Sequence, residues 1–217
     1  MRTPGWATVY IFSIFIMTGV LLAGSAAAQE PADDGIVYGT ARRQNYWLGG
    51  LRAGLSLVPA KVAYGGVKAD PGPHVNASFA RVIDDIVAIG LMSEWESHDL
   101  KVGGLKAGTG HVVSIIPYAE ARARLTGSKV VLTGSFGLGA NINFFDMAPG
   151  VTPKVKPNPM VAFRLAVGGE YEVKENAFLG LEIAYKTNNA KAEIGNLGKD
   201  NYRYNSLAFL FGGKLAF

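Results

Sequence analysis

The sequence predicts an all-β protein: an eight-stranded antiparallel, up-and-down transmembrane β-barrel that follows a cleaved signal peptide. Three observations lead to this prediction. Apolar and polar residues alternate along segments of about ten residues or more, the length that a tilted strand needs to cross a bilayer. The connections between these segments are short and long in turn. After residue 28, no apolar run reaches the length of a membrane helix.

The first 28 residues have the features of a signal peptide. Arg2 precedes an apolar segment at 6–24, and Ala26 and Ala28 are the small residues expected before cleavage at Gln29. The apolar segment is almost long enough to span a bilayer, so an uncleaved membrane anchor is the alternative. We expect a signal peptide at 1–28, an N-terminal periplasmic extension at 29–45 and the barrel at 46–217.

The composition narrows the class of function. The chain has no cysteine, which excludes disulfides and thiolate metal sites. Its 21 Lys and Arg against 17 Asp and Glu give a net charge of +4 without a basic block, so we expect no nucleic acid partner. The 28 glycines and the frequent aromatic residues suit a barrel and a soluble sandwich alike, and the strand pattern has to decide between them.

Eight segments show the alternation, an even number, as bacterial single-chain barrels require. The regular ones are 130–144, 161–173, 177–186 and 206–217. The less regular ones are 46–58, 74–83, 85–97 and 112–125. The segment 74–83 is the weakest, because Arg81 falls on its apolar face.

The connections sort by length. Those at 84–85, 126–128 and 174–176 are short, whereas those at 59–73, 97–110, 146–158 and 187–201 are long. Outer-membrane barrels have tight turns in the periplasm and long loops outside, and a soluble sandwich has no reason to sort its loops in this way. We therefore expect the apolar faces to contact lipid and the polar faces to line a lumen.

The predicted lumen is charged. Five acids and five bases fall on the inward faces, and we expect them to pair, because each unpaired ion in so narrow a space would cost on the order of several kcal/mol. The ten residues are Arg52, Glu94, Glu120, Arg122, Arg164, Glu170, Glu172, Glu182, Lys186 and Lys214.

The strand order suggests where these charges gather. Glu120 and Arg122 lie toward the periplasmic end of one strand, opposite the small residues Thr133 and Ser135, with Glu170, Glu172 and Lys214 as candidate partners. We expect this cluster to plug the lower barrel. The upper half should be less charged and offer possible ligand contacts at Ile116, Tyr118 and Asn141.

Several segments resemble the OmpW-like outer-membrane proteins. Residues 135–146, Ser-Phe-Gly-Leu-Gly-Ala-Asn-Ile-Asn-Phe-Phe-Asp, are similar to the fifth strand of that family, and Ile116-Pro117 and 170–176 are further similarities. The last strand, ending in Phe217, resembles the terminal aromatic strand that the barrel-assembly machinery reads. The resemblance implies an eight-stranded barrel in the outer membrane of a Gram-negative bacterium, with a largely apolar lumen that passes small hydrophobic molecules.

The sequence is compatible with two functions. The resemblance favours passage of a small hydrophobic ligand across or into the membrane. The charged lumen favours a structural or surface-interaction barrel with a plugged lumen, as in OmpA-type domains. In either case the expected partners are outer-membrane lipids, the assembly machinery and lipopolysaccharide. The lysines of the long loops are either solvated loop charge, the favoured alternative, or contacts for lipopolysaccharide phosphates.

A lipid A-modifying enzyme is the least favoured alternative. His111 and Ser114 are separated by two residues, which places them on opposite faces of a strand, so they cannot form the His–Ser pair of the deacylases. The other histidines, His74 and His98, fall at or beside the long loops, and we expect all three to be solvated rather than to bind a metal. We expect no catalysis and no cofactor.

Overall fold

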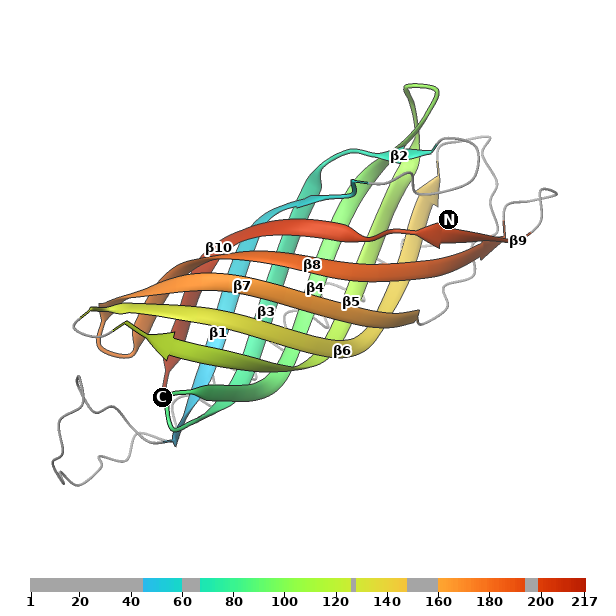
Figure 1. The fold of residues 1–217 in the computed structure, drawn as a ribbon. Coiled ribbons are helices and arrows are strands. Elements are labelled where there is room, and N and C mark those ends of the chain that lie inside the picture. The colour runs from blue at the N-terminus through green and yellow to red at the C-terminus, as the bar shows by residue number, and fades with distance from the viewer. Residues whose placement is uncertain (1–44, 60–66, 126–127, 148–159, 194–198) are drawn as a thin grey trace, which may run out of the picture.

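The computed structural model describes residues 45–59, 67–125, 128–147, 160–193 and 199–217. The predicted signal peptide at 1–28 and nearly all of the predicted periplasmic extension lie outside these residues. Within the part of the chain that is described, no helix is long and apolar enough to cross a membrane. All regular elements of these segments are strands (Figure 1).

Eight long antiparallel strands form the barrel, which confirms the predicted fold. They are β1 (Asn45–Leu57), β3 (Gly72–Ile83), β4 (Val87–Val102), β5 (Leu105–Arg124), β6 (Val130–Met147), β7 (Met160–Lys174), β8 (Ala177–Glu193) and β10 (Ser206–Ala216). Two short strands lie outside this ring: β2 (Lys68–Ala69) pairs with β4, and β9 (Lys199–Arg203) pairs with β8.

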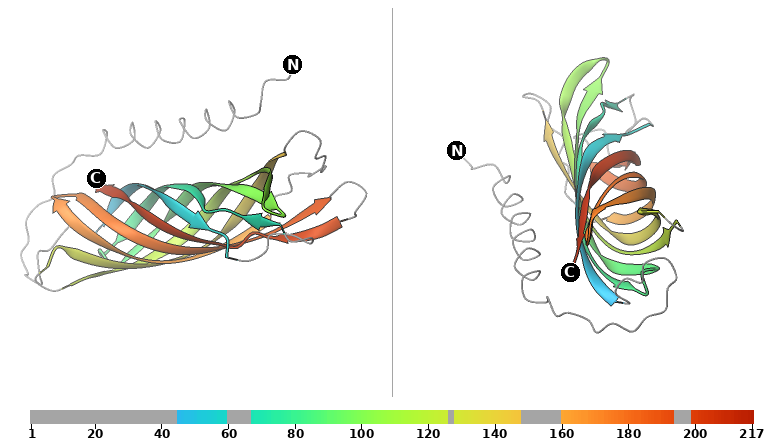
Figure 2. Two further views of the ribbon diagram at one scale, coloured as in Figure 1. Left: turned by 90° about the horizontal axis from the view of Figure 1, so that it is seen from above. Right: turned by 90° about the vertical axis from the view of Figure 1, so that its left-hand side faces the viewer.

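The sheet closes on itself. Each long strand pairs with the next along the chain, and β10 pairs with both β8 and β1. The strands are tilted against the barrel axis and wrap around it (Figures 1 and 2). Closure leaves no strand edge in the hydrocarbon, so the backbone N–H and C=O groups are satisfied without water.

The burial pattern distinguishes a membrane barrel from a soluble sandwich. Large apolar side chains face outward and are exposed, for example Leu181 at 65% and Phe211 at 57%. Charged side chains on the opposite faces are buried, for example Arg164 at 1% and Lys186 at 2%. A water-soluble protein would show the reverse arrangement, so the exterior of this barrel is suited to lipid.

The seam between the first and last strands closes at the end of the barrel that carries the short turns, which is the periplasmic end in the predicted orientation. Trp47 N donates to Phe217 O at 2.8 Å, and Phe217 N donates to Trp47 O at 3.0 Å. The indole of Trp47 stacks on Phe79, with ring centroids 4.8 Å apart. The guanidinium of Arg81 lies 5.4 Å from the Trp47 ring. This cation–π contact explains how an outward arginine is accommodated on the apolar face of β3.

Two of the predicted long loops continue the sheet. β4 and β5 pair as far as Val102 and Leu105, joined by Gly103 and Gly104 with φ of 58° and 88°. This hairpin projects beyond the neighbouring strands (Figure 1), and β8 likewise extends to pair with β9. The prediction of a loop over 97–110 was wrong. Outside the bilayer the outward face of a strand contacts water instead of lipid, so its residues no longer need to be apolar, while the hydrogen-bonded ladder continues.

Candidate functional site: the lumen

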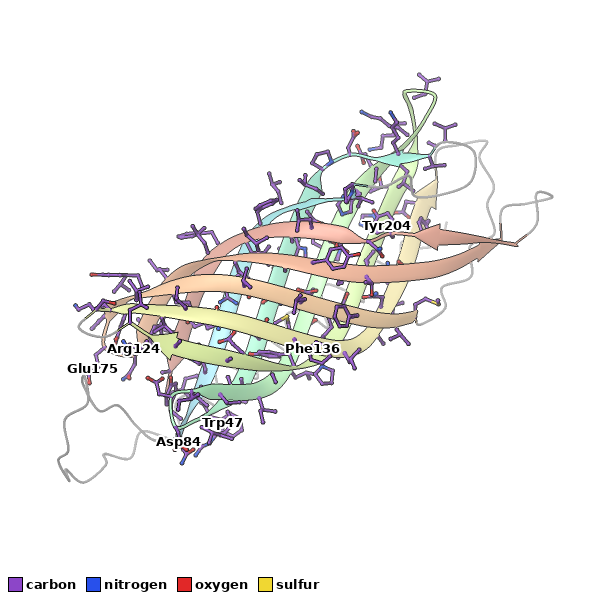
Figure 3. All side chains as sticks on the ribbon, viewed as in Figure 1. Trp47, Asp84, Arg124, Phe136, Glu175 and Tyr204 are labelled. Carbon is purple, nitrogen blue, oxygen red and sulfur yellow. The ribbon has the colours of Figure 1, made fainter. Side chains whose placement is uncertain are left out.

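Charged side chains fill the interior of the barrel. The ten predicted lumen residues all face inward, and none is more than 4% exposed. Each lies within 3.3 Å of an oppositely charged group. Figure 3 shows side chains along the whole length of the barrel, from Arg124 near the short turns to Tyr204 toward the opposite end.

The periplasmic part of the network joins three strands. Arg122 on β5 donates from Nη1 to Glu120 Oε1 at 2.7 Å and from Nη2 to Glu170 Oε2 on β7 at 3.1 Å. Lys214 on β10 lies 2.7 Å from both Glu120 Oε1 and Glu170 Oε1. Glu172, proposed from the sequence as part of this group, instead pairs with Arg124 at 3.0 Å.

The small residues on β6 leave room for this cluster. Thr133 is the register partner of Arg122, and Ser135 is the partner of Glu120, as the sequence predicted. The long side chains of β5 can therefore cross toward β7 and β10 instead of packing against β6. The ring of Phe178 lies 5.6 Å below the Arg122 guanidinium and adds an apolar contact.

A second group of charges occupies the middle of the lumen. Arg164 on β7 donates from Nε to Glu94 Oε1 on β4 at 2.8 Å, and from Nη2 to Glu182 Oε1 on β8. Arg52 on β1 lies 2.7 Å from Glu170 Oε1 and 3.2 Å from Glu182 Oε2. Arg52 therefore connects the middle group to the periplasmic one.

The charges continue into the extracellular half. Lys186 Nζ lies 3.3 Å from Glu94 Oε2 and 3.1 Å from Glu96 Oε1. Glu96 also accepts a 2.7 Å hydrogen bond from Ser56 Oγ. The prediction of a less charged upper half was therefore wrong, because the inward row of β4 carries acids at two successive positions.

Glu96 was missed by the sequence analysis, although it stands two residues after Glu94 and shares its face. Arg124 at the periplasmic rim was missed as well, and it pairs with Glu172. Adding one acid and one base to the predicted five of each gives six acids and six bases. The formal charges of this lumen network therefore balance.

Two histidines predicted to be solvated are buried inside the lumen, so that prediction was wrong. His74 is 1% exposed, with Nε2 3.4 Å from Glu94 Oε1 and Nδ1 3.5 Å from Glu96 Oε2. His98 is also 1% exposed; its Nδ1 lies 2.8 Å from Asp70 O and its ring packs edge-on against Tyr204. Among the described residues, no group of three or more His, Cys, Asp or Glu is placed to hold a metal ion.

His111 lies on the outward face of β5 and is also buried, at 8% exposure, so the expectation that it is solvated was wrong as well. Its ring stacks on Trp95 at a centroid distance of 6.2 Å, and its Nε2 is 3.7 Å from Asp146 Oδ2. Ser114 faces the lumen, where its Oγ donates to Asn141 Oδ1 at 2.6 Å. The two residues thus occupy opposite faces of β5, the arrangement expected from their spacing.

The predicted ligand contacts are packed against other side chains. Ile116 is 0% exposed and Tyr118 is 5% exposed, within an apolar cluster that includes Met92. Asn141 is 0% exposed, and its amide donates to Thr187 O at 3.0 Å. A ligand would reach these groups only by displacing the contacts they make here.

An apolar cluster lies at the extracellular end of the lumen. It is formed by the buried residues Val58, Leu100, Val112 and Tyr204, with Phe145 and Met160 among those packed against it. Beneath it, Asn143 and Asn188 exchange hydrogen bonds of 3.2 and 2.5 Å between β6 and β8. The outer end of the lumen therefore has an apolar cluster of its own, separate from the cluster that includes Ile116 and Tyr118.

No family model matches the sequence, and a search of curated proteins gives no match. The fold is nevertheless similar to that of solved barrels. OprG, an outer membrane protein of Pseudomonas aeruginosa, aligns with a TM-score of 0.60 at 17% identity, covering 80% of this chain and 96% of OprG. Neisserial surface protein A aligns with a TM-score of 0.53 at 15% identity, covering 79% and 97%.

A third similar structure is the outer membrane protein AlkL in lipid bilayers, with a TM-score of 0.50 at 11% identity, covering 86% of this chain and 97% of AlkL. At these identities the likeness shows the fold alone. Two of these neighbours, OprG and AlkL, are outer membrane proteins. With its closed sheet and apolar exterior, the chain is an integral outer-membrane β-barrel.

Proposed function

We propose that this protein is a structural or surface-interaction barrel whose lumen is closed by the ion-pair network. The observation that carries the proposal is the continuity of that network. Lys214 and Arg122 bind Glu170, Arg52 links Glu170 to Glu182, and Arg164 links Glu182 to Glu94. These pairs join strands on different sides of the barrel, so a solute could cross only by separating them.

Separating the pairs is unfavourable. An ion left without its partner in a buried site costs about 3–5 kcal/mol, far above thermal energy. The cost of opening a path rises with each pair that has to break. A barrel built in this way is stable and closed. Its function would then depend on binding at its surface and not on transport through its lumen.

The β4–β5 hairpin supplies such a surface. Leu105 at its tip is 79% exposed and Val102 is 45% exposed. The register places Lys68 opposite Lys101 and Lys101 opposite Lys106, so three lysines lie side by side across β2, β4 and β5. We propose that they contact lipopolysaccharide phosphates, which lysine binds as a point charge.

Two acids pair with two of these three lysines. Lys101 Nζ lies 2.6 Å from Asp70 Oδ2, and Lys106 Nζ lies 2.7 Å from Asp99 Oδ1. Two acids against three lysines leave an excess of positive charge at the base of the hairpin. A phosphate would have to compete with these carboxylates. Because the lysines are exposed, salt would screen the proposed contact and weaken it.

Two measurements test the proposal. Refolded protein in liposomes should admit a small hydrophobic dye no faster than empty liposomes do. Replacing Lys68, Lys101 and Lys106 by Gln should weaken binding of purified lipopolysaccharide without altering the barrel. Dye uptake that depends on the protein would contradict the closed lumen, and unchanged lipopolysaccharide binding would contradict the surface contact.

The apolar mouth favours one second candidate, uptake of small hydrophobic molecules. Val58, Leu100 and Val112 would offer such a molecule an apolar site at the outer end of the lumen. Because the charged network lies below, the molecule would have to leave sideways into the membrane. The same dye experiment separates the two candidates.

A further inference from the structure

Two buried histidines face one carboxylate at the extracellular end of the lumen. His74 lies on β3 and His98 on β4, and the carboxylate is that of Glu96, which is buried as well. His74 Nδ1 lies 3.5 Å and His98 Nε2 lies 3.7 Å from the same oxygen, Glu96 Oε2. We call these three residues the histidine cluster. Because they are so close together in a buried site, the protonation of each ring depends on the charge of the acid.

The hydrogen bond of His98 determines which of its ring nitrogens carries the proton. Nδ1 lies 2.8 Å from the backbone oxygen of Asp70. A carbonyl oxygen only accepts, so Nδ1 donates and carries the hydrogen. In the neutral ring Nε2 then has a lone pair, which lies against the Glu96 carboxylate. A proton on Nε2 converts this contact between two acceptors into an ion pair.

His74 faces a carboxylate at each of its nitrogens. Nε2 lies 3.4 Å from Glu94 Oε1, and Nδ1 lies 3.5 Å from Glu96 Oε2. Neither nitrogen has a hydrogen-bond partner among the described residues. A neutral imidazole has one N–H, so in either neutral form one nitrogen presents a lone pair to a carboxylate. The imidazolium has a proton for both, and the site therefore matches the charged form of the ring.

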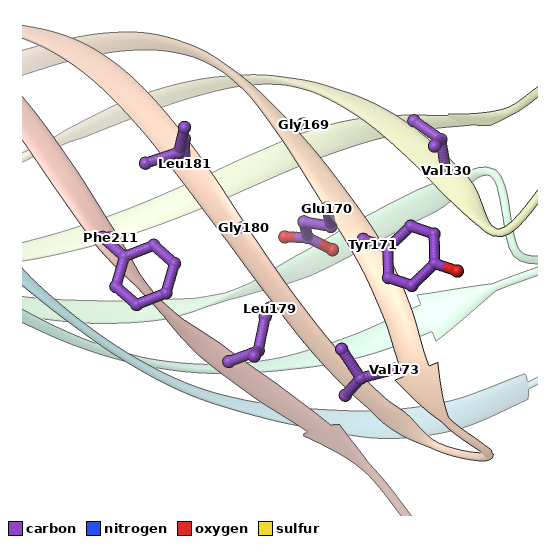
Figure 4. A pocket seen from close by; sticks show the side chains of 9 residues that line it. All are labelled: Val130, Gly169, Glu170, Tyr171, Val173, Leu179, Gly180, Leu181 and Phe211. Carbon is purple, nitrogen blue, oxygen red and sulfur yellow. The ribbon is translucent and has the colours of Figure 1, made fainter.

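Glu96 is short of positive charge compared with the other acids of the network. Among the described residues, Lys186 is the one lysine or arginine within ion-pair distance of Glu96, and it is shared with Glu94. Glu170 pairs with three cations: Arg52, Arg122 and Lys214. Figure 4 shows Glu170 on β7, next to the hollow in the wall that it helps to line. Two imidazolium rings would supply the charge that Glu96 lacks.

Other groups around His74 affect the balance between its two forms. Burial favours the neutral ring, and so does Lys186 on β8, which pairs with both acids that face the ring. Arg164 on β7 also pairs with Glu94, at 2.8 Å. On β1, Ser56 is uncharged and donates at 2.7 Å to the carboxylate oxygen that faces Nδ1. Against burial and these two cations stand two carboxylates in contact with the ring, one at each nitrogen.

The surroundings of His98 are less charged. Its ring packs edge-on against Tyr204, at a centroid distance of 5.2 Å. The carboxylate of Asp70 pairs with Lys101, so the backbone oxygen is the part of Asp70 that binds the ring. On β5, His111 faces outward and stacks on Trp95. The acid of the histidine cluster is therefore the charged group that faces Nε2.

We propose that the histidine cluster is an acid-responsive clamp at the extracellular end of the barrel. When both rings are protonated they bind Glu96, and they hold together β3, β4 and Asp70, which lies between β2 and β3. When the rings are neutral, the lone pairs that face the carboxylate weaken the same contacts. Because His98 packs on Tyr204, the change reaches the apolar cluster at the end of the lumen. The proposal does not depend on whether the lumen conducts.

The sign of the pH effect follows from linkage between folding and protonation. The folded state has sites for two imidazolium rings and the unfolded chain has none, so protonation favours folding. In the unfolded chain imidazole titrates at about pH 6.5. The stabilisation is therefore complete below about pH 6.5 and is lost as the pH rises and the folded rings lose their protons. At pH 5.5 glutamates still carry charge, since they ordinarily titrate at about pH 4.3.

Urea unfolding of the refolded protein in lipid vesicles at pH 5.5 and pH 8, followed by gel mobility, tests the clamp. The double variant His74→Gln and His98→Gln removes both titrating rings and keeps polar groups in their place. His111→Gln is the matched control, because His111 is a buried histidine on the outward face. Nitrogen NMR of wild type labelled at histidine gives the protonation state of each ring, and the single variants assign the signals.

We expect the equilibrium constant for unfolding of wild type to be about tenfold lower at pH 5.5 than at pH 8. The double variant should lose this difference, and His111→Gln should keep it. By NMR, His74 and His98 should each have two protonated nitrogens at pH 5.5, and His98 should keep the proton on Nδ1 at pH 8.

Three results would overturn the proposal. They are equal stability of wild type at the two pH values, a pH effect that persists in the double variant, and a neutral ring of His74 or His98 at pH 5.5. If the double variant does not refold, the NMR measurement on wild type decides alone.

Discussion

Arg164 Nε on β7 donates to Glu94 Oε1 on β4 at 2.8 Å. In the sheet β5 and β6 separate these two strands, so the bond crosses the lumen rather than running between neighbours. Arg164 and Glu94 are each 1% exposed. The pair thus connects opposite walls of the barrel and also fills the space between them. The network to which it belongs therefore contributes both to the stability of the barrel and to the closure of its lumen.

Arg122→Ala should destabilise the barrel by about 3–5 kcal/mol, because Glu120 and Glu170 would lose a buried partner. Urea unfolding of the refolded protein in lipid vesicles, followed by gel mobility, measures this. Arg124→Ala is the control and should have a smaller effect, since Arg124 is 16% exposed at the rim. If both substitutions lowered the free energy of unfolding equally, the periplasmic end of the lumen would already be accessible to water.

Deletion of Phe217 should lower the amount of folded protein in the outer membrane without reducing export. The deletion removes both backbone hydrogen bonds to Trp47 at the seam and the contact with Phe79. Phe209→Ala is the matched control, because Phe209 is an outward aromatic on the same strand but lies opposite Leu55, away from the terminal hydrogen bonds to Trp47. Quantifying folded protein in membrane fractions gives the answer, and normal assembly of the truncated chain would argue against a role of Phe217 as an assembly signal.

Protease added to intact cells should cut the β4–β5 hairpin at 102–105 and leave 126–128 intact. The hairpin tip is exposed and lies at the opposite end of the barrel from the short turns. Mass spectrometry of the fragments identifies the sites. Cleavage at 126–128 from outside would mean that the barrel has the opposite orientation in the membrane.

The base of the same hairpin should loosen in acid. Asp99 lies beyond the membrane-spanning part of β4, and its hydrogen bond from Lys106 holds the pKa of the carboxyl below its ordinary value. Because the folded pKa is the lower one, the stabilisation is present above about pH 3.9 and is lost as the pH falls through the folded value. Hydrogen-exchange protection of the hairpin amides at pH 7 and pH 3 measures this. At both pH values, the Asp99→Asn variant should show the low hydrogen-exchange protection that wild type shows at pH 3.

The sequence was sufficient to predict the barrel because lipid and lumen impose opposite polarities on alternate residues. The outward leucines of β8 and the inward Glu182 and Lys186 show this directly. The inward charges could be identified for the same reason. The partner of each charge could not be predicted. Arg164 and Glu94, for example, meet across the lumen, and strand order alone does not specify such contacts.

The misplaced histidines have a related cause. His74 and His98 lie where the strands leave the membrane, and there the outward residues no longer need to be apolar. Asp99 and Lys101 alternate with His98 and Leu100, a pattern that resembles a polar loop. The ladder nevertheless continues through them, so His98 keeps an inward position and is buried.

The ionic conductance of the refolded protein in a planar lipid bilayer tests the closed lumen most directly. Wild type should show no steady open channel, because buried ion pairs join the walls along the lumen. Arg122→Ala should show measurable current, because the periplasmic cluster would lose the guanidinium that binds two of its acids. Steady conductance in wild type, or identical records for wild type and Arg122→Ala, would contradict a lumen closed by this network.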